Sequence, residues 1–397
     1  MIRENFLRFI YQAASMQRWN DHNRPNKGFT ELDKQAQKLF FAYVIGRFEE
    51  ETHAVDWTAL IEGALFEFFQ RTLLTDIKPP IFHMLMEKHG EKLNDLVMGK
   101  LHDIGLFDIQ KGFGERMRDY LYDPEYSKHE KTILSASHYM ATKWEFDIVY
   151  RMSTGFFGIE ETKRSIERQL EEYQNIDGVK KLVSSREAVD FLNLVGQLRF
   201  QQRWAQTQRI PETSVAGHML IVALLTYILT LQLDPCEKRK YNNFFAGLFH
   251  DMPEVLTRDI ISPVKNSIAG LGDLIKTIED MQMEEVLLPL LPEGWRTEIR
   301  YFTADEFADK VILEGKTVKV DTDKLCECYN KDVFSPVDGS LIEFCDKFAA
   351  YMEAYLSIKH GISSKNLVDG HRDLYENFGH RKIAGMDLGI MFDYFKL

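Results

Sequence analysis

The sequence has only four cysteines in 397 residues, Cys236, Cys326, Cys328 and Cys345. Four cysteines, all of them late in the chain, are too few to form a disulfide framework. No second Cys/His pair follows the C-x-C pair at zinc-finger spacing, so we interpret the cysteines as reduced thiols. Positive charge is also scarce, since 61 acidic side chains against 49 lysines and arginines give a formal net charge of -12. This acidity argues against a nucleic-acid partner, although a local Lys/Arg cluster can still bind a small phosphorylated substrate.

Long hydrophobic runs are lacking as well. No stretch approaches the roughly 20 apolar residues that span a bilayer, and residues 1–6 lack the charged-then-apolar plan of a secretory signal. We therefore predict a cytoplasmic protein with no membrane contact. The length exceeds that of one usual hydrophobic core, so two domains are expected.

Strand signals are sparse, and helical periodicity dominates the sequence. Apolar residues recur three and four apart in residues 220–229 and 341–351, as on one face of a helix. The best strand signal is residues 311–313 and 317–320, which flank Glu314-Gly315-Lys316 and predict a small hairpin. We predict an all-α, mostly helical protein with a small β-hairpin insertion in its second half.

An internal repeat divides the chain. Residues 65–81 align without gaps on residues 248–264, and residues 17–19 and 202–204 both read Gln-Arg-Trp. We predict two tandem copies of one helical domain, at residues 1–160 and 185–397. Glu67-Phe68 of the first copy corresponds to His250-Asp251 of the second. Because phenylalanine cannot ligate a metal, the first copy is expected to lack the metal site described next.

The strongest local feature is the dipeptide His250-Asp251, at the end of an apolar helix and just before Pro253. Proline disfavours the helical conformation in the residue before it and donates no backbone hydrogen bond, so the helix should bend or stop here. Adjacent residues on a straight helix point about 100° apart, and the break lets both side chains converge on one ion. Pro253 then suits the first turn of a new helix that carries Glu254.

Two further candidate ligands lie far away in the sequence. His218 falls in the first turn of an apolar helix that Thr213 or Ser214 can cap. Asp346 lies in so apolar a stretch that its carboxylate needs a partner, for which a divalent cation is one candidate. Two imidazoles and two carboxylates suit Mn, Fe, Co, Ni or Zn, and Mg less well. Taken singly, each residue has an alternative role as a hydrogen-bonded core histidine or a paired aspartate; the ordered set is more specific.

The order His, His-Asp, Asp resembles that of the HD-domain metal-dependent phosphohydrolases. Within them, residues 191 to about 361 resemble the bacterial 5'-deoxynucleotidases, through Arg203-Trp204, residues 212–218, residues 250–265 and Asp346 with the five residues after it. The resemblance implies hydrolysis of (deoxy)nucleoside 5'-monophosphates with one divalent ion. It assigns the metal to His218, His250, Asp251 and Asp346, the acid/base role to Glu254, and substrate binding to Arg203, Trp204, Thr257, Asp259 and Lys265.

The sequence departs from that pattern in two places. The spacer between Asp251 and Asp346 is longer than in the family, and the first 190 residues have no counterpart in the single-domain enzymes. Two alternatives therefore stay open: hydrolysis of a cyclic or polyphosphorylated nucleotide, and a non-catalytic nucleotide sensor. A second site at His102-Asp103 is disfavoured, because the repeat places the corresponding position at Glu67-Phe68. We further predict an intrachain pseudo-dimer of the two halves and leave a homo-oligomer open.

Overall fold

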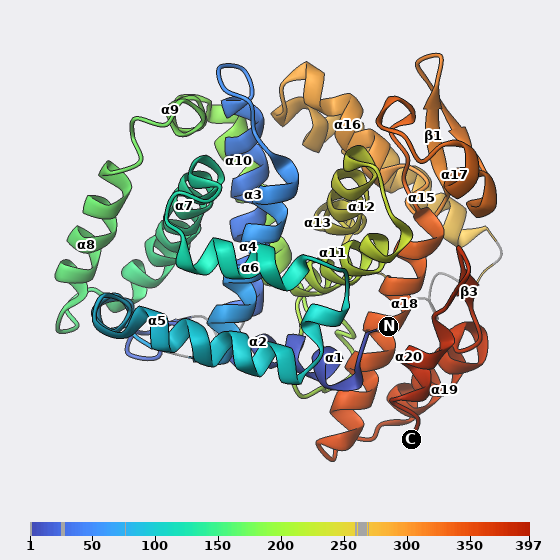
Figure 1. Ribbon diagram of the computed structural model, residues 1–397, viewed down its shortest axis with the longest axis horizontal. Helices are drawn as coiled ribbons and strands as arrows, with labels where there is room; N and C mark the ends of the chain where they lie inside the picture. Colours follow the sequence, from blue (N-terminus) through green and yellow to red (C-terminus); the bar gives the residue numbers. More distant parts are fainter. Residues whose placement is uncertain (1, 25–27, 76, 259, 261–267, 269) are drawn as a thin grey trace. The chain divides into compact units, whose positions relative to one another are not determined.

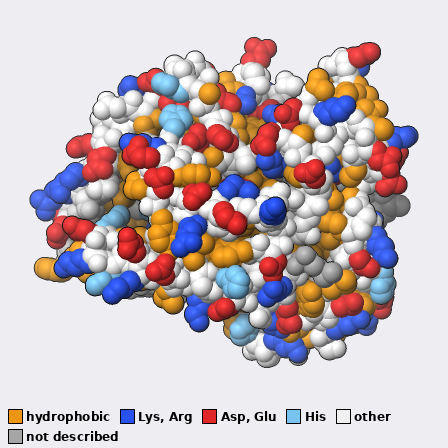
Figure 2. Space-filling model, in the orientation of Figure 1, with side chains coloured by type: hydrophobic (Ala, Val, Ile, Leu, Met, Phe, Trp, Pro, Cys, Tyr) orange, Lys and Arg blue, Asp and Glu red, His pale blue; other side chains and the backbone are white. Residues whose placement is uncertain are grey.

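The computed structural model describes residues 2–24, 28–75, 77–258, 260, 268 and 270–397. The chain separates into two compact units, Met1–Arg186 and Glu187–Leu397. Helices make up most of both units (Figure 1), and the described β-structure consists of two short hairpins. The prediction of a mostly helical fold is therefore confirmed. Acidic and basic side chains are interspersed over the face shown in Figure 2.

The first unit contains nine α-helices among its described residues, and α5 is kinked at His89. Their bounds are α1 Glu4–Ile10, α2 Gln12–Ser15, α3 Glu31–Glu49, α4 Trp57–Leu74, α5 Pro79–Asp103, α6 Phe113–Tyr122, α7 Lys128–Ser153, α8 Ile159–Glu171 and α9 Asp177–Ser184.

Helix α3 forms the centre of the first unit. Almost all of its side chains are buried, and it packs against α7 and α9, while α4 packs against α6 and α7. The side chain of Thr30 caps α3 by accepting a hydrogen bond from its first turn, a usual N-cap interaction. Helix α8 belongs to this unit, because Ile159 and Ile166 pack onto Phe146 of α7. His102 and Asp103 are both exposed at the end of α5.

The second unit begins within α10 and carries the remaining elements. Their bounds are α10 Arg186–Val195, α11 Val215–Thr230, α12 Glu237–Phe249, α13 Glu254–Thr257, α15 Leu271–Gln282, α16 Glu293–Thr303, β1 Lys310–Leu313, β2 Lys316–Lys319, α17 Thr322–Cys328, α18 Gly339–Lys359, α19 Lys365–Phe378, β3 Lys382–Ile383, β4 Met386–Asp387 and α20 Gly389–Asp393.

Helix α11 is the core of the second unit. All of its residues are buried, and it packs against α12 and α18. The stretch Val215–Leu233 is long and apolar enough to span a bilayer, with 94% of its window buried inside the protein. The statement that no stretch approaches that length was therefore wrong. A helix that is enclosed by protein on every side is apolar all round, as a membrane-spanning helix is.

The predicted hairpin is present. Strands β1 and β2 pair antiparallel, from Lys310 with Lys319 to Leu313 with Lys316. Glu314 and Gly315 at the turn both have positive φ angles, of 50° and 75°, as a tight two-residue hairpin turn requires. A second hairpin, β3–β4, has only two residues in each strand and escaped prediction because so short a run has no readable alternation.

Candidate metal centre

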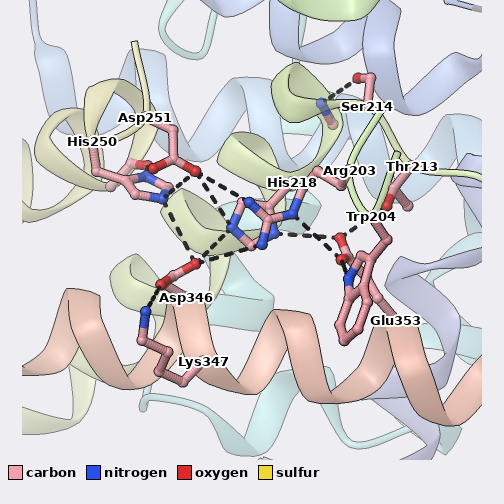
Figure 3. A network of polar contacts seen from close by, with 12 residues as sticks. Arg203, Trp204, Thr213, Ser214, His218, His250, Asp251, Asp346, Lys347 and Glu353 are labelled. Carbon is pink, nitrogen blue, oxygen red and sulfur yellow. Dashed lines mark hydrogen bonds and ion pairs between the residues drawn. The ribbon is translucent and has the colours of Figure 1, made fainter. Parts of the chain in front are cut away.

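Three helices of the second unit bring four potential metal ligands together (Figure 3). His218 lies in the first turn of α11, His250 and Asp251 directly follow α12, and Asp346 lies within α18. One ligand atom from each lies within 4.8 Å of the others, and no other such group of three or more occurs among the described residues. Ser214 fixes the start of α11, because its hydroxyl accepts a backbone N–H of the first turn at 2.9 Å.

The backbone around the His-Asp dipeptide has the predicted break. Helix α12 ends at Phe249 and α13 begins at Glu254, directly after Pro253. Gly247 brings this end of α12 close to α11, since a Cβ atom at Gly247 would lie 3.0 Å from the Ala223 Cα. A larger residue there would push the two helices, and the ligands they carry, apart.

The Nδ1 atom of His250 has a hydrogen-bond partner, and that of His218 has a carboxylate neighbour at longer distance. His250 Nδ1 lies 2.8 Å from the Gly247 carbonyl oxygen, and His218 Nδ1 lies 3.4 Å from Oε1 of Glu353. An acceptor at Nδ1 favours the tautomer whose Nε2 lone pair is free to bind a metal. In both histidines Nε2 faces the two aspartates (Figure 3).

The two aspartates supply negative charge to the centre. Asp346 uses Oδ2 to accept a hydrogen bond from Lys347 at 2.7 Å, and its Oδ1 lies 2.8 Å from His218 Nε2. Oδ2 of Asp251 lies 3.2 Å from His250 Nε2. Burial raises the pKa of both carboxyls, but the cationic neighbours, chiefly Lys347 for Asp346 and His250 for Asp251, outweigh it and bring each pKa below its ordinary value. Both side chains are therefore ionised at neutral pH.

The donor set fits a divalent transition-metal ion. Two imidazole nitrogens and two carboxylate oxygens form a mixed set typical of Mn, Fe, Co, Ni and Zn sites. Among the described residues, the buried His250 Nε2 makes no hydrogen bond, and burying a polar atom without a partner is costly. Metal binding would displace the proton of His250, after which the four side chains carry two negative charges, which a divalent cation would balance.

Glu353, which we did not predict, joins the centre to two predicted substrate residues. This buried carboxylate accepts hydrogen bonds from the Trp204 Nε1–H at 3.0 Å and from the Thr213 hydroxyl at 2.9 Å, and lies 3.4 Å from the Arg203 Nε. Trp204 and Arg203 are thus held beside the metal ligands (Figure 3). Glu353 follows Asp346 by seven residues, which places both on one face of α18. The seven-residue spacing from Asp346 is the sequence signal that could have predicted Glu353.

A cavity of about 220 Å³ opens beside the His-Asp dipeptide. The described residues that line it are His250, Asp251, Pro253, Glu254, Gly272, Ile275, Lys276, Glu279, Asp280, Thr303 and Glu306. Glu254 is 8% exposed, so its carboxylate meets the cavity rather than bulk solvent. Thr257 contacts Glu279 at 3.3 Å, and Asp259 and Lys265 lie outside the described residues.

Comparisons with known proteins agree with this geometry. The HD domain family model matches residues 195–375, which include all four clustered side chains. A 5'-deoxynucleotidase of Vibrio atlanticus is 28% identical over 139 residues, which cover 34% of this chain and 70% of the relative. One of Photobacterium profundum is 27% identical over 178 residues, covering 43% and 76%, and one of Pasteurella multocida is 26% identical over 162 residues, covering 38% and 76%. The second unit of this chain therefore matches the HD domain family over most of its length and is similar to the 5'-deoxynucleotidases.

Proposed function

We propose that this HD-superfamily phosphohydrolase cleaves the phosphomonoester of a (deoxy)nucleoside 5'-monophosphate. The observation that carries the proposal is the convergence of His218, His250, Asp251 and Asp346 within 4.8 Å, next to a cavity that Glu254 also lines. The relatives named 5'-deoxynucleotidase support this substrate class over other phosphate esters.

The four clustered side chains would hold one divalent ion. Such an ion supplies Lewis acidity and lowers the pKa of a coordinated water toward neutrality. The ion would be Mn, Co, Fe, Ni or Zn, and Mg would fit this donor set less well. His250, whose Nδ1 contacts the Gly247 carbonyl oxygen, and His218, whose Nδ1 lies beside the Glu353 carboxylate, would present their Nε2 atoms to the ion.

Glu254 is the proposed acid/base group. It is four residues from His250 and lines the same cavity, so its carboxyl can take a proton from the attacking water or give one to the departing sugar oxygen. Arg203 lies 3.4 Å from Asp251 and about 4 Å from Asp346, and it would balance charge on the phosphoryl oxygens. The Trp204 ring, fixed at its Nε1–H by Glu353, offers a flat wall for the sugar. Thr257, Asp259 and Lys265 remain proposed substrate residues.

The test is phosphate release from a panel of ribo- and deoxyribonucleoside 5'-monophosphates, with cyclic and polyphosphorylated nucleotides alongside, in the presence of Mn or Co. We expect hydrolysis of monophosphates, and a loss of roughly 100-fold or more in Asp251→Ala, since even outer partners of a metal ligand cost 10–100-fold. Wild-type rates in that variant would refute the metal assignment. Hydrolysis of the other nucleotides alone would change the substrate class, and metal and nucleotide binding without hydrolysis would identify a sensor.

We also infer that the two units are copies of one domain. Gln17 pairs with Thr30, and Gln202 with Ser214, in isolated antiparallel bridges. In each unit the residue two positions after the glutamine is a tryptophan with a positive φ, of 59° and 56°. Each indole donates to a buried glutamate of a later helix, at 2.9 Å in the first unit and 3.0 Å in the second. So specific a combination is hard to obtain twice by chance.

The intrachain pseudo-dimer is part of the same proposal, in which the first unit supports the second. We expect residues 187–397, expressed alone, to be less stable or less active than the full chain. If both halves were separately stable and the second fully active, the pseudo-dimer would be refuted.

A further inference from the structure

The first unit has a buried polar centre of its own. Lys34 and Lys38, one turn apart on α3, both have side chains that are completely buried. The Lys34 ammonium hydrogen-bonds to the ring of His138 on α7, and the Lys38 ammonium pairs with Glu67 of α4. The helices are those that, under the proposed duplication, correspond to the three helices of the metal centre.

The positions of this centre match those of the metal centre one by one. Lys34 and His218 each lie four residues after the cap of their helix, which is Thr30 in the first unit and Ser214 in the second. His138 and Asp346 each lie seven residues before the buried glutamate, which is Glu145 in the first unit and Glu353 in the second. In the ungapped alignment of residues 65–81 with residues 248–264, Glu67 corresponds to His250, Phe68 to Asp251 and Arg71 to Glu254.

The charge at these five positions is reversed. In the second unit they carry three carboxylates, of Asp251, Glu254 and Asp346, and no permanent cation. In the first unit they carry two basic side chains, Lys34 and Arg71, and the single carboxylate of Glu67. With neutral histidines, the formal charge is therefore -3 in one unit and +1 in the other. A site with this composition repels a divalent cation and attracts an anion.

Lys34 is the basic side chain of this centre that makes no direct ion pair among the described residues. Arg18 contacts Glu31 and Glu145 at 2.9 Å and 3.0 Å, and Arg71 lies 3.7 Å from Glu31. Among the described residues, no carboxylate pairs with the Lys34 ammonium, whose contact is the His138 ring. An ammonium buried without a counter-ion is costly.

The electrostatic state of the centre agrees with this excess of positive charge. Burial, and then the surrounding cations, hold the pKa of Lys34 and that of His138 well below their ordinary values. Lys34 itself is buried, whereas the side chains of Arg18, Arg71 and Glu67 around it are 15%, 20% and 30% exposed.

We propose that the first unit binds a phosphate group directly on Lys34, Arg71 and Arg18, at the place where the second unit has its metal ligands. The anion would give Lys34 the direct ion pair that it lacks, and lysine with arginine is the usual chemistry for a phosphate. The first unit would then be a phosphate-binding copy without hydrolytic groups. This inference rests on the proposed duplication and not on the nucleotidase activity.

The experiment is calorimetric titration of the full-length chain carrying Asp251→Asn, treated with EDTA so that no phosphate binds through a metal. Inorganic phosphate is one titrant and deoxyadenosine 5'-monophosphate the other. We expect one phosphate per chain, with affinity at least tenfold lower in Lys34→Met and in Arg71→Gln. Tighter binding of the nucleotide would identify a nucleotide as the source of the phosphate, and equal binding would identify the free ion.

A matched control is Lys347→Met, which removes the lysine beside Asp346 in the second unit and should leave phosphate binding unchanged. Lys34→Met replaces an unpaired buried ammonium by an apolar chain of similar length, so it should fold, and thermal unfolding checks this. Absence of phosphate binding, or binding that falls in Lys347→Met and persists in Lys34→Met and Arg71→Gln, would overturn the proposal. Because binding is measured without metal and without turnover, failure here is distinct from failure of the proposed function.

Discussion

The substitution Glu353→Gln tests how far the surroundings of the metal ligands contribute to the site. The Glu353 carboxylate is buried and lies 3.4 Å from the His218 Nδ1. It also accepts hydrogen bonds from the Trp204 Nε1–H and from the Thr213 hydroxyl. Glutamine has the same shape but no charge, and its NH₂ group cannot accept from the imidazole. The negative charge beside His218 Nδ1, which favours a protonated Nδ1 and an Nε2 available to a metal, is then lost, and the single carbonyl oxygen of glutamine cannot face both Nδ1 and the Trp204 and Arg203 donors.

Partners of metal-ligating histidines typically contribute 10–100-fold to metal affinity, which is roughly 1.4–2.7 kcal/mol. We expect a decrease of that size in the affinity of Glu353→Gln for Zn or Mn, measured by competition with a chromophoric chelator. Phosphate release should fall in parallel at limiting metal and recover in part at saturating metal, because the four ligands themselves remain.

Glu145→Gln is the matched control. Glu145 is as buried as Glu353 and is likewise paired with an arginine and a tryptophan, Arg18 and Trp19. Both substitutions leave an arginine less well paired and should lower stability by about 3 kcal/mol, the lower end for breaking a buried ion pair. Only Glu353→Gln should lower metal affinity. Equal losses in the two variants would show that the effect on the metal is indirect, and unchanged affinity in Glu353→Gln would refute the reasoning.

Three further substitutions test the fold. Ser214→Ala removes the cap of α11 and should cost about 1 kcal/mol of unfolding free energy in urea, with no effect on the first unit. Asp338→Asn leaves the buried Arg239 guanidinium without its two-point partner and should cost roughly 3–5 kcal/mol; a loss below 1 kcal/mol would contradict it. Burial raises the pKa of Glu31, but Arg18 and the neighbouring cations outweigh the effect of burial and lower the pKa from 4.5 to about 2. The stabilisation is present above pH 4.5 and lost as pH falls from 4.5 toward 2, so Glu31→Gln should flatten the acid limb of stability by roughly 3 kcal/mol.

Local patterns predicted the elements of the fold well where backbone chemistry decides the outcome. The interruption between α12 and α13 follows from Pro253, and the β1–β2 turn follows from Gly315 with its flanking apolar residues. The hydropathy of α11 was harder to interpret, because a helix that crosses a membrane and a helix enclosed by a protein core have the same composition. Only its packing against α12 and α18 distinguishes them.

The candidate ligands could be predicted because each is a polar side chain in an apolar segment, which needs a partner wherever it lies. The four indeed lie together. Glu353 has the same property and was not predicted, because it belongs to none of the motifs that identified the other four residues. Sequence also gave no indication that Lys276 and Glu306 line the cavity, because they lie on segments whose position depends on the packing of α15 and α16.

The two units, considered as copies, separate what the fold requires from what the chemistry requires. The contacts of arginine and tryptophan with a buried glutamate occur in both units, although among the described residues the cluster of candidate metal ligands occurs in the second unit alone. Those contacts must therefore stabilise the domain even without a metal. The ligand positions instead differ in the sign of their charge, from -3 to +1, while the surrounding helices keep their caps and their order. A fold that tolerates this reversal is held together by α3 or α11 and their apolar neighbours, so the polar centre is free to change from binding a cation to binding an anion.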